Sequence, residues 1–363
     1  MSAYSTAEPL RICLVLTTGR CGSTALSAII REHPAMLSVS ELFSALYDHD
    51  LSERELTGAE LWEMMSTPSR ADEVGLKCHI KVDEMLYPAF EPFLGANRFN
   101  WATGVPPLLQ ITIPHLTQQP DDLYAELEEI TPKQPPRLLS AHLWWLFGVL
   151  AGDQPAQVVV ERSGASLAHA AELLRLFPQA RVVHLFRDGR ECAVSMSRHP
   201  RFKVAAIRAA MRARLGYDPY QEVGAPSRES GGAASLGSPN DEELEALTPD
   251  RVTRARFEQF DVPLRRYGVM WSMMIADGMA GLPEKSRLMT LDYADLATHP
   301  REAIGRLTEF LEVESAPDWE RRMAAKIRPG RDIRREVGEQ EWAELTRACR
   351  LGMNCLYGRG NWT

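Results

Sequence analysis

The sequence has little of what several large classes of protein require. Its 363 residues carry a formal net charge of −8, whereas proteins that bind nucleic acids or anionic membranes need a basic surface. No apolar run reaches the roughly 20 residues that span a bilayer. The longest, residues 143–152 (LWWLFGVLAG), is better suited to a buried helix. We therefore expect neither a nucleic-acid partner nor a membrane.

Cysteine is also scarce, and its positions carry no ligand pattern. The six cysteines form no CxxC pair and have no metal-site spacing to histidine: Cys13, Cys21, Cys78, Cys192, Cys349 and Cys355. This predicts reduced thiols and no metal site. The first residues (MSAYSTAEPLRICLVLTT) lack a basic region before the short apolar run, so we expect no signal peptide and a cytoplasmic location.

Strand-like and helix-like segments alternate along the chain. Four β-rich runs are each followed by helical periodicity: residues 11–18, 156–163, 181–188 and 287–293. Continuous apolar strands of this kind predict a parallel sheet that is covered on both faces. The fold class is therefore α/β, with three layers: a central parallel sheet flanked by helices. Residues 338–358 predict an amphipathic helix that ends at Gly358.

We interpret residues 1–363 as a single domain that two segments interrupt. Residues 84–137 are rich in proline and aromatic residues, which predicts an irregular insertion on the substrate side. Residues 222–250 are rich in Gly, Ser, Pro and acidic residues and poor in large apolar ones. They predict a mobile loop or lid, with a disordered surface excursion as the alternative.

The first run leads into a glycine-containing turn, TTGRCGST (residues 17–24). Gly19 and Gly22 allow a tight turn and a close approach of the backbone to a ligand. The amides of Gly22, Ser23 and Thr24 would then face an anion at the start of the next helix, and Arg20 adds a positive charge. A nucleoside-triphosphate loop would have lysine after the second glycine, and that lysine is missing.

A second anion site is predicted in RVVHLFRDGRECAVSMSRHP (residues 181–200). Arg187 leaves the end of a strand, and Ser195 follows after a helix start. A guanidinium fork and a helix hydroxyl can together hold a phosphate monoester. If each residue is considered alone, the alternative is that Arg187 pairs with Asp188 at the strand end and that Ser195 is exposed.

Together the two segments resemble the sulfotransferase family that uses 3′-phosphoadenosine-5′-phosphosulfate (PAPS), in its bacterial type. Residues 20–24 (RCGST) resemble the family's 5′-phosphosulfate loop, and residues 187–195 resemble its RDPRxxxxS motif for the 3′-phosphate. LMTLDYADLATHP (residues 288–300) resembles a Tyr-Glu-Asp-Leu segment in which the tyrosine, here Tyr293, lies near the adenine. The resemblance covers residues 11–43 and about 156–312. It implies a P-loop NTPase-like sulfotransferase fold with helical and irregular insertions.

The sequence departs from the family pattern at several positions. Cys21 replaces a serine of the loop, and a thiolate there would repel the phosphosulfate. Gly189 replaces a proline, which would loosen the turn. ERSG (residues 161–164) replaces Lys-Thr-Pro, so that a basic contact moves to Arg162. Ala294 replaces the glutamate after the tyrosine.

Transfer of a sulfuryl group to a hydroxyl needs a base for the hydroxyl proton. The resemblance implies Glu41, in SELF shortly after the first helix, with a helix-capping glutamate as the alternative. A histidine is the rival base. His79 is one candidate, because Lys77 would share its face of a predicted strand and bind the sulfuryl oxygens. His115 and His142 are the others.

Two further sequence features bear on the nucleotide site. Trp271 is better explained as core than as a surface for adenine. A basic cluster near the carboxyl end would close the 3′-phosphate site or form a solvated face: Arg328, Arg331, Arg334 and Arg335.

The function predicted from the sequence is sulfuryl transfer from PAPS, without a metal, to a hydroxyl of a small-molecule alcohol, phenol or carbohydrate. Two rivals remain: a nucleotide kinase-like enzyme, and an inert nucleotide-binding module on the same fold. The sequence leaves a homodimer open.

Overall fold

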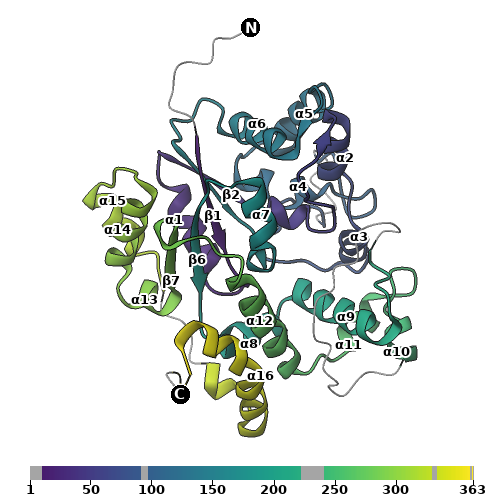
Figure 1. Ribbon diagram of the computed structural model, residues 1–363. Helices are drawn as coiled ribbons and strands as arrows, with labels where there is room; N and C mark the ends of the chain where they lie inside the picture. Colours follow the sequence, from purple (N-terminus) through teal and green to yellow (C-terminus); the bar gives the residue numbers. More distant parts are fainter. Residues whose placement is uncertain (1–9, 91–96, 222–240, 329–332, 360–361, 363) are drawn as a thin grey trace.

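The computed structural model describes residues 10–90, 97–221, 241–328, 333–359 and 362 (Figure 1). Its centre is a five-stranded sheet in the order β2-β5-β1-β6-β7, and all its strand pairs are parallel. The strands are β1 (Arg11–Leu16), β2 (Met36–Ser40), β5 (Val158–Arg162), β6 (Arg181–Phe186) and β7 (Leu288–Asp292). The four predicted strands are confirmed. Sequence reasoning missed β2, because its five residues, MLSVS, include two serines.

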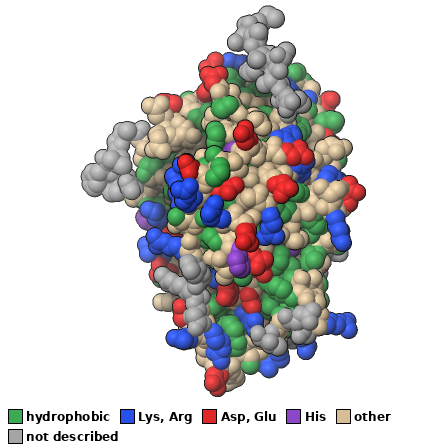
Figure 2. Space-filling view, turned by 90° about the vertical axis from the view of Figure 1, so that its left-hand side faces the viewer, with side chains coloured by type: hydrophobic (Ala, Val, Ile, Leu, Met, Phe, Trp, Pro, Cys, Tyr) green, Lys and Arg blue, Asp and Glu red, His purple; other side chains and the backbone are tan. Residues whose placement is uncertain are grey.

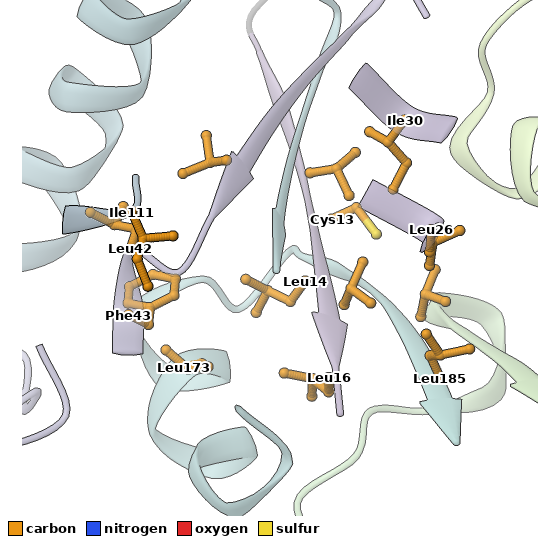
Figure 3. Packing of buried hydrophobic residues seen from close by; sticks show 14 of the residues in the cluster. Cys13, Leu14, Leu16, Leu26, Ile30, Leu42, Phe43, Ile111, Leu173 and Leu185 are labelled. Carbon is orange, nitrogen blue, oxygen red and sulfur yellow. The ribbon is translucent and has the colours of Figure 1, made fainter. Parts of the chain in front are cut away.

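Side chains of β1 pack alternately against the two covering layers. Cys13 lies on the side of Leu26 and Ile30, which belong to α1 (Ser23–Arg31) (Figure 3). Leu14 lies on the opposite side, towards Leu173 of α7 (Ala170–Leu176). Residues 12–16 are all buried. Successive strand side chains point to opposite faces, so a fully apolar strand needs helices on both sides, which confirms the predicted three-layer arrangement.

The remaining elements surround this sheet. The other helices are α2 (Gly58–Ser66), α3 (Arg70–Lys77), α4 (Pro107–Gln110), α5 (Pro120–Ile130), α6 (Leu139–Ala151), α8 (Gly189–Ser197), α9 (Pro200–Leu215), α10 (Asp241–Glu245), α11 (Arg254–Gln259), α12 (Leu264–Met279), α13 (Tyr293–Thr298), α14 (Pro300–Leu311), α15 (Pro317–Ala324) and α16 (Glu339–Tyr357). Short strands β3 (Glu55–Leu56) and β4 (Arg137–Leu138) pair antiparallel. Short 3₁₀ turns include η1 (Phe43–Ala45) and η3 (Ser166–His169). The predicted carboxyl-terminal helix is confirmed as α16, with Gly358 as its cap.

Two segments differ in part from their predictions. The 84–137 insertion is helical over α4 and α5 rather than irregular throughout. Residues 222–240 of the predicted loop lie outside the described residues. Residues 241–250 begin with α10, and Leu244 and Leu247 are buried in a second apolar cluster with residues of α9. These two leucines explain why this part of the segment packs against the protein.

Two further features of the fold are the apolar character of its helices and the distribution of charge on one face of its surface. Among the residues described, no helix combines the length and apolar character that a membrane span requires. Figure 2 shows basic and acidic side chains interspersed on the face that lies to the left in Figure 1, where α13, α14 and α15 are.

Parallel pairing brings the carboxyl ends of four strands to one edge of the sheet. Ser40 pairs with Arg162, and Val15 also pairs with Arg162. Leu16 pairs with His184, two residues before β6 ends. The loops that follow β1, β2, β5 and β6 therefore meet at this edge. Open parallel sheets bind their ligands at such an edge.

Trp271 belongs to the core, as the sequence favoured. Its side chain is completely buried on α12, between α8 and α16. A Cβ added at Gly189 would lie 2.3 Å from the Trp271 ring, and one added at Gly352 would lie 2.5 Å from it. Gly189 is the first residue of α8. It provides the space that the indole fills, which gives this glycine a packing role that the sequence did not predict.

We expect Gly189→Ala to lower the free energy of unfolding by about 1–3 kcal/mol, because the added methyl group would overpack the site. Denaturant unfolding would measure the change. Gly148→Ala is the matched control: Gly148 lies in α6, and a Cβ there meets nothing within 4 Å. Alanine's helix propensity should make that control neutral or stabilising. Equal effects of the two substitutions would contradict the packing role of Gly189.

Candidate active site

A cavity of about 430 Å³ lies where the loops after β1, β2, β5 and β6 meet. Its lining residues are Gly19, Arg20, Gly22, Ser23, Thr24, Ala25, Glu41, Ser44, Val82, Glu84, Ile111, Arg162, Gly164, Ala165, Arg187, Ser195, His199, Arg201, Phe202 and Ala205. The two predicted anion sites and the predicted base thus face the same cavity.

The glycine-containing loop joins β1 to α1 in the predicted strand–turn–helix order. Gly19 and Gly22 have φ values of +76° and +90°, which favour glycine. Gly22 caps α1, and the first amides of a helix have no acceptor within it. Ser23 and Thr24 line the cavity at this helix start. The loop therefore presents to the cavity the groups that bind anions in other proteins.

The Cys21 side chain does not lie beside the predicted phosphosulfate site, contrary to what the sequence suggested. Its side chain is fully buried, and it is not among the described residues that line the cavity. Burial raises the pKa of the thiol to about 11, so the group is neutral near pH 7. The predicted thiolate repulsion does not arise, because this side chain of the loop points into the protein.

The second predicted anion site lies beside the first. Arg187 follows β6, Ser195 belongs to α8, and both line the cavity. Arg20 Nε donates a 3.1 Å hydrogen bond to Ser195 Oγ, which joins two motifs 175 positions apart. Arg187 pairs with Glu191 and lies 5.3 Å from the ring centre of Tyr293. Tyr293 in turn covers Gly22, where an added Cβ would lie 2.1 Å from the ring.

Glu41 follows β2 and is held by the end of β5. Its amide donates to the Arg162 carbonyl at 2.8 Å. Its carboxylate pairs with the Arg162 guanidinium and accepts a 2.9 Å hydrogen bond from the Gly164 amide. Arg162 is only 3% exposed, and its Nε donates to Ser27 Oγ at 2.9 Å. Arg162, where the sequence predicts a basic contact, is among the lining residues of the cavity.

Sequence reasoning missed Glu84 and His199. Glu84 pairs with Arg20 (Oε1 to Nη1, 2.9 Å), and its other oxygen lies 3.2 Å from His199 Nε2. Burial favours the neutral carboxyl of Glu84, but the hydrogen bond and charge of His199, together with Arg20, outweigh it and lower the pKa to about 2. No motif marks Glu84. The sequence could have indicated His199, because it lies only four residues after Ser195.

Lys77 and His79 do not form the predicted pair on a strand. Ser69 and Asp72 form a capping box that starts α3, and this helix ends at Lys77. The ammonium group of Lys77 is exposed and donates to the Pro249 carbonyl at 3.4 Å. His79 is exposed in the following turn, with its ring against Trp101. Neither belongs to the described lining of the cavity.

The other predicted histidines also lie elsewhere. His142 is buried, with Nε2 2.7 Å from the Leu56 carbonyl oxygen. His115 Nδ1 lies 2.7 Å from the Arg31 guanidinium. Burial, together with the charges of Arg31 and Arg162, lowers the pKa of His115 to about 4. Neither histidine is in the described lining of the cavity.

The predicted basic cluster is described only in part. Arg331 lies outside the described residues. Arg328 is exposed, and its carbonyl accepts a 3.2 Å hydrogen bond from the Tyr293 hydroxyl. Arg334 lies over the Trp342 ring, with its guanidinium carbon 5.1 Å from the ring centre. The backbone at Arg328 therefore holds the tyrosine that covers the loop.

Three solved structures illustrate what the chain is similar to. The sulfotransferase domain from the curacin biosynthetic pathway is 13% identical over 94% of this chain and 91% of its own, with a TM-score of 0.43. Sulfotransferase STF9 from Mycobacterium avium is 14% identical over 96% and 77%, with a TM-score of 0.43. Retinol dehydratase in complex with androsterone and the inactive cofactor PAP is 12% identical over 95% and 82%, with a TM-score of 0.34.

Family models provide the assignment. A comparison with curated proteins gives no match. The model described as the sulfotransferase family matches residues 13–225, which is more than half of the chain and includes the loop, Glu41, Arg187 and Ser195. A second model, the sulfotransferase domain, matches residues 169–328. The chain belongs to the sulfotransferase family.

Proposed function

We propose that this sulfotransferase transfers a sulfuryl group from PAPS to a hydroxyl of a small-molecule acceptor. The observation that carries the proposal is the hydrogen bond from Arg20 to Ser195, which joins the two anion motifs at one cavity. PAPS has a 5′-phosphosulfate and a 3′-phosphate, and it therefore needs two anion sites. A nucleoside triphosphate has a single phosphate chain and would leave the Arg187–Ser195 site unexplained.

The residues present fit this co-substrate. Arg20, the first amides of α1 and the hydroxyls of Ser23 and Thr24 would hold the 5′-phosphosulfate. Arg187 and Ser195 would hold the 3′-phosphate, since guanidinium groups bind phosphate through paired hydrogen bonds. Tyr293 would lie at the edge of the adenine. PAPS supplies the sulfuryl group when it is bound, and the positive charge of Arg20 would stabilise the phosphate that leaves.

Glu41 is the proposed base. As the acceptor oxygen forms its bond to sulfur, the sulfur–oxygen bond to the phosphate breaks, and the hydroxyl proton passes to the Glu41 carboxylate. Arg162 and the Gly164 amide hold that carboxylate at the cavity. Arg162 also supplies a nearby positive charge for the sulfuryl oxygens, a role that the sequence had offered to Lys77.

The lining favours an acceptor with an apolar body. Val82, Ile111, Phe202 and Ala205 contribute apolar surface to the cavity, and apolar surface stabilises bound apolar groups. An alcohol or phenol is therefore the proposed acceptor, with a carbohydrate as second choice. The cytoplasmic location and the homodimer stay predictions from the sequence.

Binding of 3′,5′-ADP, the nucleotide that remains after transfer, tests the two-anion site. We expect tight binding of 3′,5′-ADP and weak binding of ATP–Mg²⁺ in calorimetric titrations, followed by transfer of labelled sulfuryl groups from PAPS to a panel of alcohols and phenols. A preference for ATP–Mg²⁺ would favour the kinase-like rival. Binding of 3′,5′-ADP without transfer across the panel would favour the inert module.

Arg187→Ala should weaken 3′,5′-ADP binding by roughly 10- to 100-fold, because hydrogen bonds to charged groups contribute about 1.5–3 kcal/mol. Calorimetry on the variant would measure the loss. Arg198→Ala is the matched control, since Arg198 is an exposed arginine that pairs with Glu336 and is not in the described lining of the cavity. Unchanged affinity in Arg187→Ala would contradict the assignment of the 3′-phosphate site.

A further inference from the structure

Four consecutive residues at the end of β5 contact the turn that carries Glu41. We call residues 161–164 the cradle and residues 41–44 the Glu41 turn. The Arg162 carbonyl and guanidinium and the Gly164 amide contact Glu41 itself. Ser163 Oγ accepts a 3.1 Å hydrogen bond from the Ser44 amide. Arg162, Ser163 and Gly164 therefore each contact the Glu41 turn directly.

Glu161 completes the cradle. Its Oε1 accepts a 2.6 Å hydrogen bond from Ser163 Oγ and a longer one, of 3.4 Å, from the Phe43 amide. Through Ser163 it is also linked to the amide of Ser44. A single carboxyl oxygen therefore organises two successive amides of the Glu41 turn.

The Glu41 turn needs such support because of its backbone. Glu41 has a φ of +60°, a conformation that residues with a Cβ rarely adopt. Residues in sparsely populated conformations persist only where surrounding contacts hold them, and they cluster at functional sites. The cradle, which comprises the last two residues of β5 and the two that follow, contributes those contacts.

Glu161 is a buried titratable group that the proposed reaction does not use. It is 1% exposed. Burial raises the pKa of its carboxyl to about 8, and the charge of Glu41 adds to this, while the hydrogen bonds from Ser163 and Phe43 and the charge of Arg162 oppose it. The carboxyl is therefore protonated near neutral pH. Its ionisation would place a second negative charge beside Glu41.

We propose that protonated Glu161, with Ser163, is a positioning residue that holds the Glu41 turn in its active arrangement, and that activity falls when Glu161 ionises. The inference rests on the proposed function, in which Glu41 is the base. Glu161 acts through the turn and does not itself contact the acceptor or the sulfuryl donor.

The sign of the pH effect on stability follows from the same burial. In the unfolded chain the carboxyl ionises near pH 4.5, and in the folded chain near pH 8. Between these values the folded state holds a proton that the unfolded state has lost, so stability falls as pH rises. The contribution is fully present below pH 4.5 and is lost once the pH passes 8. Glu161→Gln removes this dependence.

The test compares Glu161→Gln, Glu161→Leu and Ser163→Ala with the wild type, with kcat and KM measured from pH 6 to 9.5. We expect Glu161→Gln to keep kcat within about twofold at pH 6.5 and to lose the decline near pH 8, because the amide retains an acceptor and does not ionise. Glu161→Leu should lower kcat about tenfold or more, and Ser163→Ala several-fold. Neither should change the affinity for 3′,5′-ADP.

Two outcomes would overturn the inference: wild-type kcat in Glu161→Leu, or the same alkaline decline in Glu161→Gln as in the wild type. Val159→Ala, equally buried on β5, controls for a general loss of packing and should leave kcat unchanged. If Glu161→Leu does not fold, the pH profile of Glu161→Gln still tests whether the alkaline decline in kcat comes from Glu161.

A readout without catalysis separates the cradle from the proposed function. The backbone amide resonances of Phe43 and Ser44 should shift as the pH passes 8 in the wild type, but not in Glu161→Gln. Titrating resonances in a protein that transfers no sulfuryl group would overturn the proposed function and retain the cradle. Active protein whose resonances do not titrate would overturn the cradle alone.

Discussion

Glu41→Gln is expected to lower kcat for sulfuryl transfer by about 10²- to 10⁴-fold, the usual contribution of a general base. Glutamine retains an acceptor for the Arg162 guanidinium but cannot take the hydroxyl proton. The affinity for 3′,5′-ADP should stay within about twofold, because the proposed anion contacts come from residues 19–24 and from Arg187. Transfer rates at saturating PAPS, together with calorimetry, would measure both quantities.

Two controls make this result specific. Arg162 is buried, so thermal unfolding of Glu41→Gln must be compared with the wild type before its rate is interpreted. Glu312→Gln alters another carboxylate that pairs with arginine, here Arg11 and Arg181, and it should leave kcat unchanged. If Glu41→Gln keeps its full rate, the base must be another group, and the pair of Glu84 and His199 would be the next to test.

Gly22→Ala is expected to weaken 3′,5′-ADP binding by about 100-fold or more. The residue has a φ of +90°, a left-handed conformation that costs roughly 1–2 kcal/mol once a Cβ is present. The Cβ would also lie 2.1 Å from Tyr293, so the ring must move, which adds about 1–3 kcal/mol of overpacking. The loop of residues 19–24, which we call the anion loop, and the Tyr293 ring that covers it would both shift. Calorimetric titration would measure the loss.

Gly216→Ala tests the left-handed backbone conformation without the steric clash. Gly216 has a similar φ of +79°, but a Cβ there meets nothing within 4 Å. This control should lower stability slightly and leave 3′,5′-ADP binding intact. Wild-type binding in Gly22→Ala would mean that Tyr293 does not set the shape of the anion loop.

Local patterns determined the parts of the site that lie on one stretch of chain. The glycines and hydroxyls of residues 17–24 act within one strand–turn–helix unit, so their spacing alone predicted their place. Arg187 and Ser195 were likewise predicted from one strand end and the helix that follows. The alternation of apolar strands with helices predicted the parallel sheet, because a strand buried on both faces needs covering layers.

Local patterns failed where a neighbouring signal was stronger. Lys77 and His79 look like a strand when read in isolation, but the capping box at Ser69 and Asp72 continues into a helix through Lys77. Strand β2 was missed because its two serines interrupt the apolar pattern, although all five of its residues are buried. The sequence predicts that the Cys21 thiol lies beside the phosphosulfate, but this side chain is buried, because a loop motif does not reveal which of its side chains points inward.

Only the tertiary structure decided which distant residues meet. Glu84 and Arg20 are 64 positions apart, and Glu161 and Phe43 are 118 apart. Neither pair lies within one helix or strand, so no periodicity relates its members. Parallel strand order brings β2 beside β5 and thereby places the cradle against the Glu41 turn. The sequence by itself predicted which groups would bind anions, whereas packing determined which side chains hold those groups and the proposed base in place, because such contacts depend on the order of strands in the sheet.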